Sequence, residues 1–85
     1  MEHLIIAFRS RAHTVQFSNF LRRNGVRNLI VNTPKEAGVG CGLSVETEIK
    51  DLARVKMLLK RSGLDSFAGI FKVYESKGRR VVTTI

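Results

Sequence analysis

The chain has 85 residues, room for one domain with one hydrophobic core, and its apolar fraction of 44% is ordinary for a globular protein. A single cysteine excludes a framework of internal disulfides and favours a reducing compartment, so we expect a cytoplasmic protein. The net charge of +8 calls for an anionic partner to be considered, whereas the longest apolar run, residues 4–8, is too short for a signal peptide or a membrane span.

The first part of the chain predicts a strand, a helix and a second strand. Residues 3–8 form a short apolar run that is typical of an interior strand. Ser10 is a suitable N-cap for a helix over residues 11–24, which contain neither glycine nor proline, and Gly25 is placed to end that helix. Residues 26–32 then predict the second strand.

The middle of the chain predicts a loop, a strand and a second helix. The loop covers residues 33–40 and contains the only proline, and strand character resumes over residues 41–46. Thr47 is the expected N-cap of a helix over residues 48–62, which Gly63 ends. The apolar face expected for this helix consists of Ile49, Leu52, Ala53, Val55 and Leu59.

The C-terminal part predicts a strand over residues 67–74, a turn over 75–78, and a β-branched run over 79–85 that pairs back as a hairpin. The resulting order, β-α-β-β-α-β plus a final strand, predicts an α+β fold of the ferredoxin-like, split βαβ type. That plan is a four-stranded antiparallel sheet with two helices on one face, plus a C-terminal β-strand. The predicted core comprises Ile5, Phe17, Leu21, Ile30, Leu43, Leu52, Leu59 and Ile70.

Cys41 is the one candidate for a reactive group. In the predicted plan the third strand lies between the first and second and is antiparallel to both, so its beginning meets the end of the first strand. Cys41 should therefore lie near the start of the first helix and its neighbours, Arg9, Ser10, Arg11 and His13. A helix N-terminus and two guanidinium groups would stabilise a thiolate. The flanking Gly40 and Gly42 could turn backbone amides toward an anion.

Other interpretations of the same residues stay open at this point. A free cysteine is usually a small buried hydrophobe, and the glycines would then only shape a turn. The positive charge is compatible with weak, non-specific nucleic-acid binding, although the aromatics that an RNA-binding sheet uses for stacking are missing. A non-catalytic, dimeric or regulatory module is a further alternative. The spacing of histidines and cysteine argues against a metal site, and we expect no cofactor.

The stretch from Thr33 to Ser44 resembles the family of selenium/sulfur carrier-like proteins. That family shows a proline, a basic residue, several small residues, and then Cys-Gly-Leu with a small residue after it. Pro34, Lys35 and the run Cys41-Gly42-Leu43-Ser44 match in order and spacing. Weaker matches extend over nearly the whole chain: Phe8 and Ser10, Leu21 with Gly25, and Gly69-Ile70. The family usually has serines before the cysteine, where this chain has Gly38 and Gly40.

The resemblance implies a carrier that accepts sulfane sulfur or selenium on the thiolate of Cys41, and an accessory protein rather than an enzyme. Arg9, Ser10, Arg11, Lys35, Gly40 and Gly42 are the residues expected to stabilise the thiolate or the bound anion. The implied partners are donor and acceptor proteins for sulfur or selenium. A homodimer is compatible with the sequence as well, and no membrane is expected.

Overall fold

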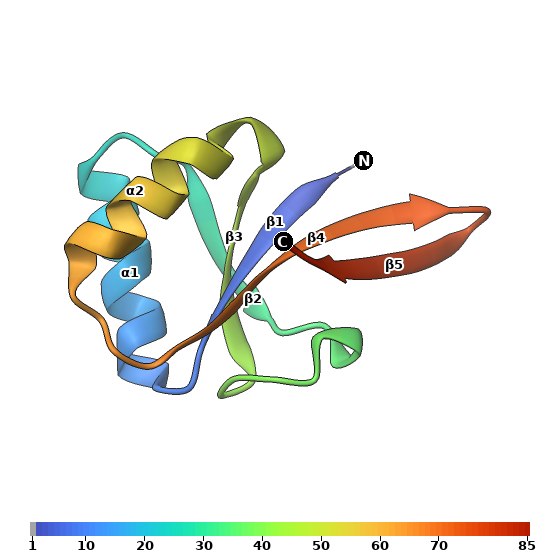
Figure 1. Ribbon diagram of the computed structural model, residues 1–85, viewed down its shortest axis with the longest axis horizontal. Coiled ribbons are helices and arrows are strands. Elements are labelled where there is room, and N and C mark those ends of the chain that lie inside the picture. Colours follow the sequence, from blue (N-terminus) through green and yellow to red (C-terminus); the bar gives the residue numbers. More distant parts are fainter. Residues whose placement is uncertain (1) are drawn as a thin grey trace.

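The computed structural model describes residues 2–85 and folds them into a five-stranded antiparallel sheet with two α-helices (Figure 1). The strand order is β2-β3-β1-β4-β5. The strands are β1 (His3–Phe8), β2 (Asn28–Asn32), β3 (Leu43–Glu48), β4 (Phe67–Ser76) and β5 (Arg79–Thr84). The helices are α1 (Arg11–Arg23) and α2 (Leu52–Ser62), with short 3-10 turns η1 (Lys35–Ala37) and η2 (Ile49–Asp51). No helix within residues 2–85 is long and apolar enough to cross a membrane.

The position predicted for the third strand is confirmed. β3 pairs with both β1 and β2 and is antiparallel to each. The predicted count of four strands in the sheet is wrong, because β5 pairs with β4 over six residue pairs and adds a fifth strand at the edge. Lys77 and Gly78 both have positive φ, 52° and 74°, the backbone that a two-residue hairpin turn requires. The hairpin predicted at the C-terminal end is thereby confirmed.

Two apolar clusters lie on opposite faces of the sheet. Both helices pack on one face, where their side chains contact alternate residues of β1. The cluster on this face includes Leu4, Ile6, Phe8, Phe17, Leu21, Val45, Val55, Leu58 and Ile70. The other face buries Ile5 and Ala7 together with Phe71 and Val73. Ala37 and Val82 pack against this second cluster, so the loop around η1 and the strand β5 cover the face that the helices leave open (Figure 1).

The main differences from the predicted boundaries lie at β2, at β3 and at the start of α2, and β4 also runs to Ser76 rather than to residue 74. β2 begins at Asn28 rather than at residue 26, because the amide of Val26 donates to the Leu21 carbonyl and extends the end of α1. β3 runs two residues later than predicted, because Gly40 and Gly42 have φ of 92° and 95° and keep the preceding backbone out of the strand. Thr47 is consequently not a helix cap: it is a buried residue of β3 that pairs with Leu4.

The predicted core is correct for Ile5, Phe17, Leu21 and Ile70. Ile30 is exposed instead, because β2 is an edge strand. Leu43, Leu52 and Leu59 are half-buried. In α2 the buried residues are Val55 and Leu58, whereas the predicted face member Ala53 is exposed. The helix proper begins at Leu52 after the 3-10 turn η2, and the predicted face residues Ile49, Leu52 and Leu59 pack against the core cluster.

Candidate functional site

Cys41 lies at the end of a loop that is closed at its base. The amide of Thr33 donates to the Gly42 carbonyl at 2.9 Å, and the hydroxyls of Thr33 and Ser44 lie 2.6 Å apart. The amide of Cys41 donates to the carbonyl of Phe8 at 2.9 Å. That bond fixes the cysteine beside the last residue of β1. The topological argument from the sequence had predicted this location.

The glycines of this loop are needed for its backbone. Gly40 and Gly42 both have φ in the left-handed region, which costs little without a Cβ. A Cβ on Gly40 would also lie 3.1 Å from the Phe8 carbonyl oxygen, the acceptor of the Cys41 amide. A Cβ on Gly42 would meet nothing within 4 Å. Gly40 therefore permits a close approach of two backbones, whereas Gly42 serves only the turn.

The residue Cys41 is partly exposed, and its thiol has two polar neighbours. Its Sγ lies 3.7 Å from the hydroxyl oxygen of Thr14 and 3.5 Å from the carbonyl oxygen of Leu43. The Leu43 carbonyl can only accept, so the thiol is the donor in this contact. The Thr14 hydroxyl can accept from the thiol or donate to a thiolate. The hydrogen bond between Thr14 and Cys41 can therefore form with either the thiol or the thiolate.

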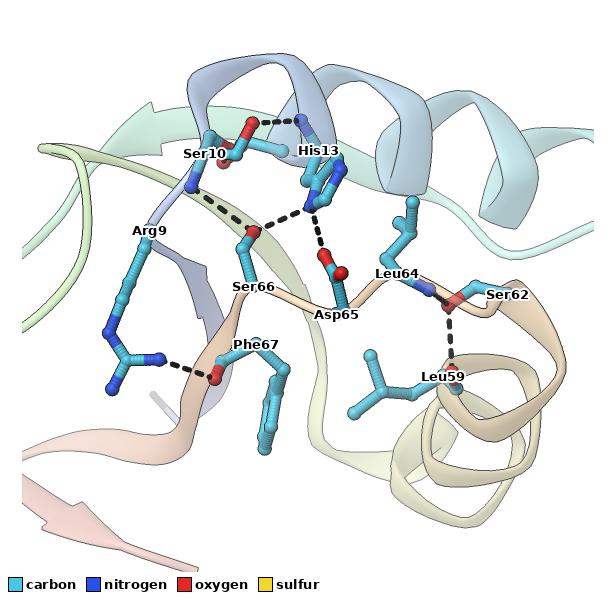
Figure 2. Close-up of polar contacts among 10 residues, drawn as sticks. Arg9, Ser10, His13, Leu59, Ser62, Leu64, Asp65, Ser66 and Phe67 are labelled. Carbon is cyan, nitrogen blue, oxygen red and sulfur yellow. Dashed lines mark hydrogen bonds and ion pairs between the residues drawn. The ribbon is translucent and has the colours of Figure 1, made fainter.

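Ser10 caps α1 and is itself held by Ser66 (Figure 2). The Ser10 hydroxyl accepts from the His13 amide at 3.2 Å, and the Ser10 amide donates to the Ser66 hydroxyl at 3.1 Å. Nδ1 of His13 lies 2.6 Å from the same Ser66 hydroxyl and 3.9 Å from an Asp65 carboxylate oxygen. These contacts tie the first turn of α1 to the segment before β4. They hold the helix that carries Thr14 at a fixed position relative to Cys41.

The three basic residues predicted for the site are differently placed. The Arg9 guanidinium donates to the Phe67 carbonyl at 3.3 Å, on the β4 side of β1 (Figure 2). Cys41 lies on the β3 side, where its amide donates to the Phe8 carbonyl. Arg11 is exposed in the first turn of α1, where no acidic residue is present. Lys35 is exposed in η1. Lys35 also lines a shallow hollow of about 340 Å³ together with Gly40 and Gly42.

A larger hollow, of about 950 Å³, lies elsewhere on the molecule. Its walls come from the start of β1, the end of β3 and the turn after α1, and they include His3, Val26 and Glu48. Cys41 contacts the opposite end of β1, at Phe8. The large hollow and the thiol are therefore separated by the length of the strand, and the size of the hollow does not make it part of the Cys41 site.

Two residues of the site were not recognised from the sequence. Neither Thr14 nor Ser66 is among the residues that the sequence predicted for the site. A polar residue within an otherwise apolar stripe, as Thr14 is beside Phe17 and Leu21, indicates a buried polar partner and could have drawn attention to it. Within residues 2–85, no three histidine, cysteine, aspartate or glutamate side chains are grouped to hold a metal ion.

Comparison with protein families matches residues 3–71 to the family described as "Putative Se/S carrier protein-like". The matched range includes the loop, Cys41, α1 and the first four strands apart from the last residues of β4. The comparisons with curated proteins and with solved structures give no match.

Proposed function

The chain belongs to this Se/S carrier-like family, and on that premise we propose that it is a carrier protein on which the thiol of Cys41 holds one atom of sulfur or selenium. The observation that carries the proposal is the partly exposed residue Cys41, fixed on a closed loop with the Thr14 hydroxyl beside its thiol. A buried cysteine in an apolar setting would not be accessible to a donor. Access and fixed position are what a carrier thiol requires.

The loading step is a transfer between thiols without net oxidation. The Cys41 thiolate attacks the outer sulfur of a donor persulfide, R–S–SH. A bond forms between Sγ and that sulfur, the donor's S–S bond breaks, and the donor leaves as the thiolate R–S⁻. Cys41 then carries a persulfide, Sγ–SH. A donor of the form R–S–SeH would load selenium in the same way, and an acceptor thiolate would reverse the step.

Thr14 supplies the hydrogen bond that this step needs. When Cys41 loses its proton, it can no longer donate to the Leu43 carbonyl, 3.5 Å away. The Thr14 hydroxyl, which also lies 3.3 Å from the Ser10 carbonyl, can turn to donate to the anion. Hydrogen bonds to charged groups contribute about 1.5–3 kcal/mol, more than those between neutral groups. The Thr14 hydroxyl is therefore the neighbouring side-chain group that can donate a hydrogen bond to the thiolate.

The remaining residues shape the surroundings of the adduct. Arg11 adds positive charge at the start of α1, where Ser10 orders the first turn, whereas the Arg9 guanidinium lies on the β4 side of β1, away from Cys41. Lys35 supplies a cation at the hollow that it lines together with the glycines. We assign Lys35 to the attraction of an anionic donor or acceptor. Gly40 and Gly42 keep the Cys41 amide and its neighbours in the required conformation.

The partners of such a carrier are a donor and an acceptor of sulfur or selenium, and the cytoplasm is the compartment that keeps Cys41 reduced. The chain acts as a carrier more than as an enzyme, because the atom it binds is also what it delivers. We also assign the scaffold to the ferredoxin-like, split βαβ type. The strand order β2-β3-β1-β4 supports this assignment, with β5 as an addition at the edge.

The proposal is tested by loading the protein with a small-molecule persulfide, cysteine persulfide, and following intact mass. We expect a gain of one sulfur atom that a dithiol reductant removes, and no gain in Cys41→Ser. Thr14→Val should load about tenfold more slowly, which corresponds to about 1.4 kcal/mol. Thr14→Ser should load nearly as fast as the wild type. Thr83→Val is the matched control, because Thr83 is exposed on β5.

Two results would contradict parts of this proposal. If the folded wild type takes up no sulfur at pH 8 and loads only after unfolding in urea, Cys41 is a structural residue and the carrier function is wrong. If Thr14→Val and Thr83→Val load at the same rate as the wild type, the role of Thr14 is wrong while that of Cys41 stands. Circular dichroism of each variant shows whether its fold is intact.

A further inference from the structure

The strand β2 is an open edge of the sheet, and it exposes two large apolar residues. Leu29 is 62% exposed and Ile30 is 42% exposed, and they lie on opposite faces of the strand. Among the described residues 2–85, β3 is the only strand that pairs with β2. We propose that a second copy of this chain docks here, its β2 pairing antiparallel with the first through a two-fold axis at Ile30.

The backbone of β2 leaves hydrogen-bonding groups free in the register that this axis requires. Thr33 donates its amide toward β3, to the Gly42 carbonyl. Because the two sides of an antiparallel strand alternate, the amides of Val31 and Leu29 also point toward β3. The amides and carbonyls of Asn28, Ile30 and Asn32 then point away from the sheet. An axis at Ile30 pairs Ile30 with its own copy and Asn28 with Asn32, which gives about six hydrogen bonds across the seam.

The side chains of β2 suit the same register. The strand has the sequence Asn-Leu-Ile-Val-Asn, so its order of polar and apolar residues is the same from either end. Pairing about the axis places Leu29 opposite Val31 and each Asn opposite an Asn. A self-complementary segment of this kind fits an isologous interface, in which both copies contribute the same surface.

Charge and the neighbouring helix favour a second copy over other occupants. No charged residue lies in β2, whereas the opposite edge strand β5 begins with Arg79 and Arg80, and charged residues commonly protect an edge. The hydroxyl of Ser18 on α1 donates to the Asn28 side chain at 2.6 Å, so α1 lies over β2. Val15, one turn earlier, is 42% exposed and adds apolar surface beside the seam.

The net charge of the chain opposes this association in a way that can be measured. Each copy carries +8, so two copies repel one another, and added salt screens the repulsion. The dimer should therefore become tighter as salt rises from about 50 mM to about 500 mM. An interface held by ion pairs, or a complex with an anionic contaminant, would weaken over the same range.

The antiparallel pairing also fixes where the two thiols lie. The loop that carries Cys41 follows β2, so the two loops lie at opposite ends of the shared strand pair. The dimer therefore leaves both thiols accessible and involves no disulfide between them. It does not depend on the carrier function, and it should form equally in Cys41→Ser under reducing conditions.

Sedimentation velocity of the full chain over a range of concentrations tests the proposal. The wild type should rise from the monomer mass of 9.5 kDa toward twice that value. Leu29→Lys and Ile30→Lys should each raise the dissociation constant at least about tenfold, because a charge then enters the seam from either face. Met57→Lys should associate as the wild type does. Met57 is 44% exposed on α2, which makes it a matched control.

Hydrogen exchange by NMR provides a readout that does not rely on substitution. The amides of Ile30, Asn28 and Asn32 should gain protection as concentration rises, whereas those of Leu29 and Val31 should be protected at every concentration. A wild type that stays monomeric at about millimolar concentration, the range in which even weak dimers form, overturns the proposal. So does a dimer that Met57→Lys disrupts while Leu29→Lys and Ile30→Lys leave it unchanged.

Discussion

Replacing Gly40 by alanine should destabilise the protein more than replacing Gly42, although the two glycines have almost the same φ. An alanine at φ of 92° or 95° is strained, and such strain costs about 1–3 kcal/mol. This cost applies to both substitutions, and so does the small gain from a less flexible unfolded chain. Both terms therefore cancel in the difference between the two variants.

The difference comes from the Phe8 carbonyl. The new Cβ of Gly40→Ala would lie 3.1 Å from that oxygen, which already accepts the Cys41 amide at 2.9 Å. The loop must move away, and the hydrogen bond that it loses contributes about 0.5–1.5 kcal/mol. For a domain of this size, about 1 kcal/mol corresponds to about 4–8 °C in Tm. Gly40→Ala should therefore melt about 4–8 °C below Gly42→Ala.

Thermal unfolding followed by circular dichroism measures the difference, and urea titration of the same variants checks it at constant temperature. The Cys41 thiol provides a second readout, because movement of the loop changes its distance from Thr14. Alkylation by iodoacetamide should change more in Gly40→Ala than in Gly42→Ala. Equal melting temperatures, or a lower one for Gly42→Ala, would refute the close approach of the loop to β1.

Three further predictions concern the core, the second face and the charge. Leu58→Ala should lower the free energy of unfolding in urea by about 2–5 kcal/mol, because Leu58 is buried in the core. Met57 is exposed, so Met57→Ala should change stability little, and equal losses in the two variants would contradict the observed face of α2. Two hydrogen bonds from Arg80 hold the pKa of the Glu36 carboxyl below its ordinary value. The pair therefore stabilises the fold above the ordinary glutamate pKa, and the contribution is lost as pH falls through the lowered one. In Arg80→Ala the NMR titration midpoint of Glu36 should rise toward its ordinary value, and an unchanged midpoint would contradict the contact. Binding of mixed-sequence RNA, measured by fluorescence anisotropy, should be weak and should fall steeply with added salt; tight, sequence-selective binding at physiological salt would instead favour a nucleic-acid-binding function.

Local sequence patterns predicted the start and end of α1 because caps act through near neighbours. Ser10 binds the amide of His13, and Gly25 adopts the positive φ of 78° that follows the helix. The same reasoning failed at Thr47, which has the composition of a cap but lies in β3. Pairing with both β1 and β2 extended that strand beyond the residue where local preference would have ended it.

The candidate site was predictable in its centre and less so in its surroundings. Cys41 and its glycines stand out in the sequence, and the crossover order of the strands placed the cysteine beside the end of β1. The Arg9 guanidinium lies on the β4 side of β1 because it donates to the carbonyl of Phe67, which is 58 residues away in the sequence. No spacing in the chain indicates that contact.

The sequence by itself therefore determined the elements, their order and the one candidate for a reactive group, because caps, glycines and apolar periodicity act over a few residues. Tertiary structure decided which groups surround that thiol and which apolar residues stay exposed. Thr14 meets Cys41 across 27 residues, and Ser66 holds Ser10 across 56. Ile30 has the composition of a core residue but lies on the edge strand, where no further strand covers it. Contacts of this range depend on how whole elements pack, and burial is a property of that packing rather than of any residue alone.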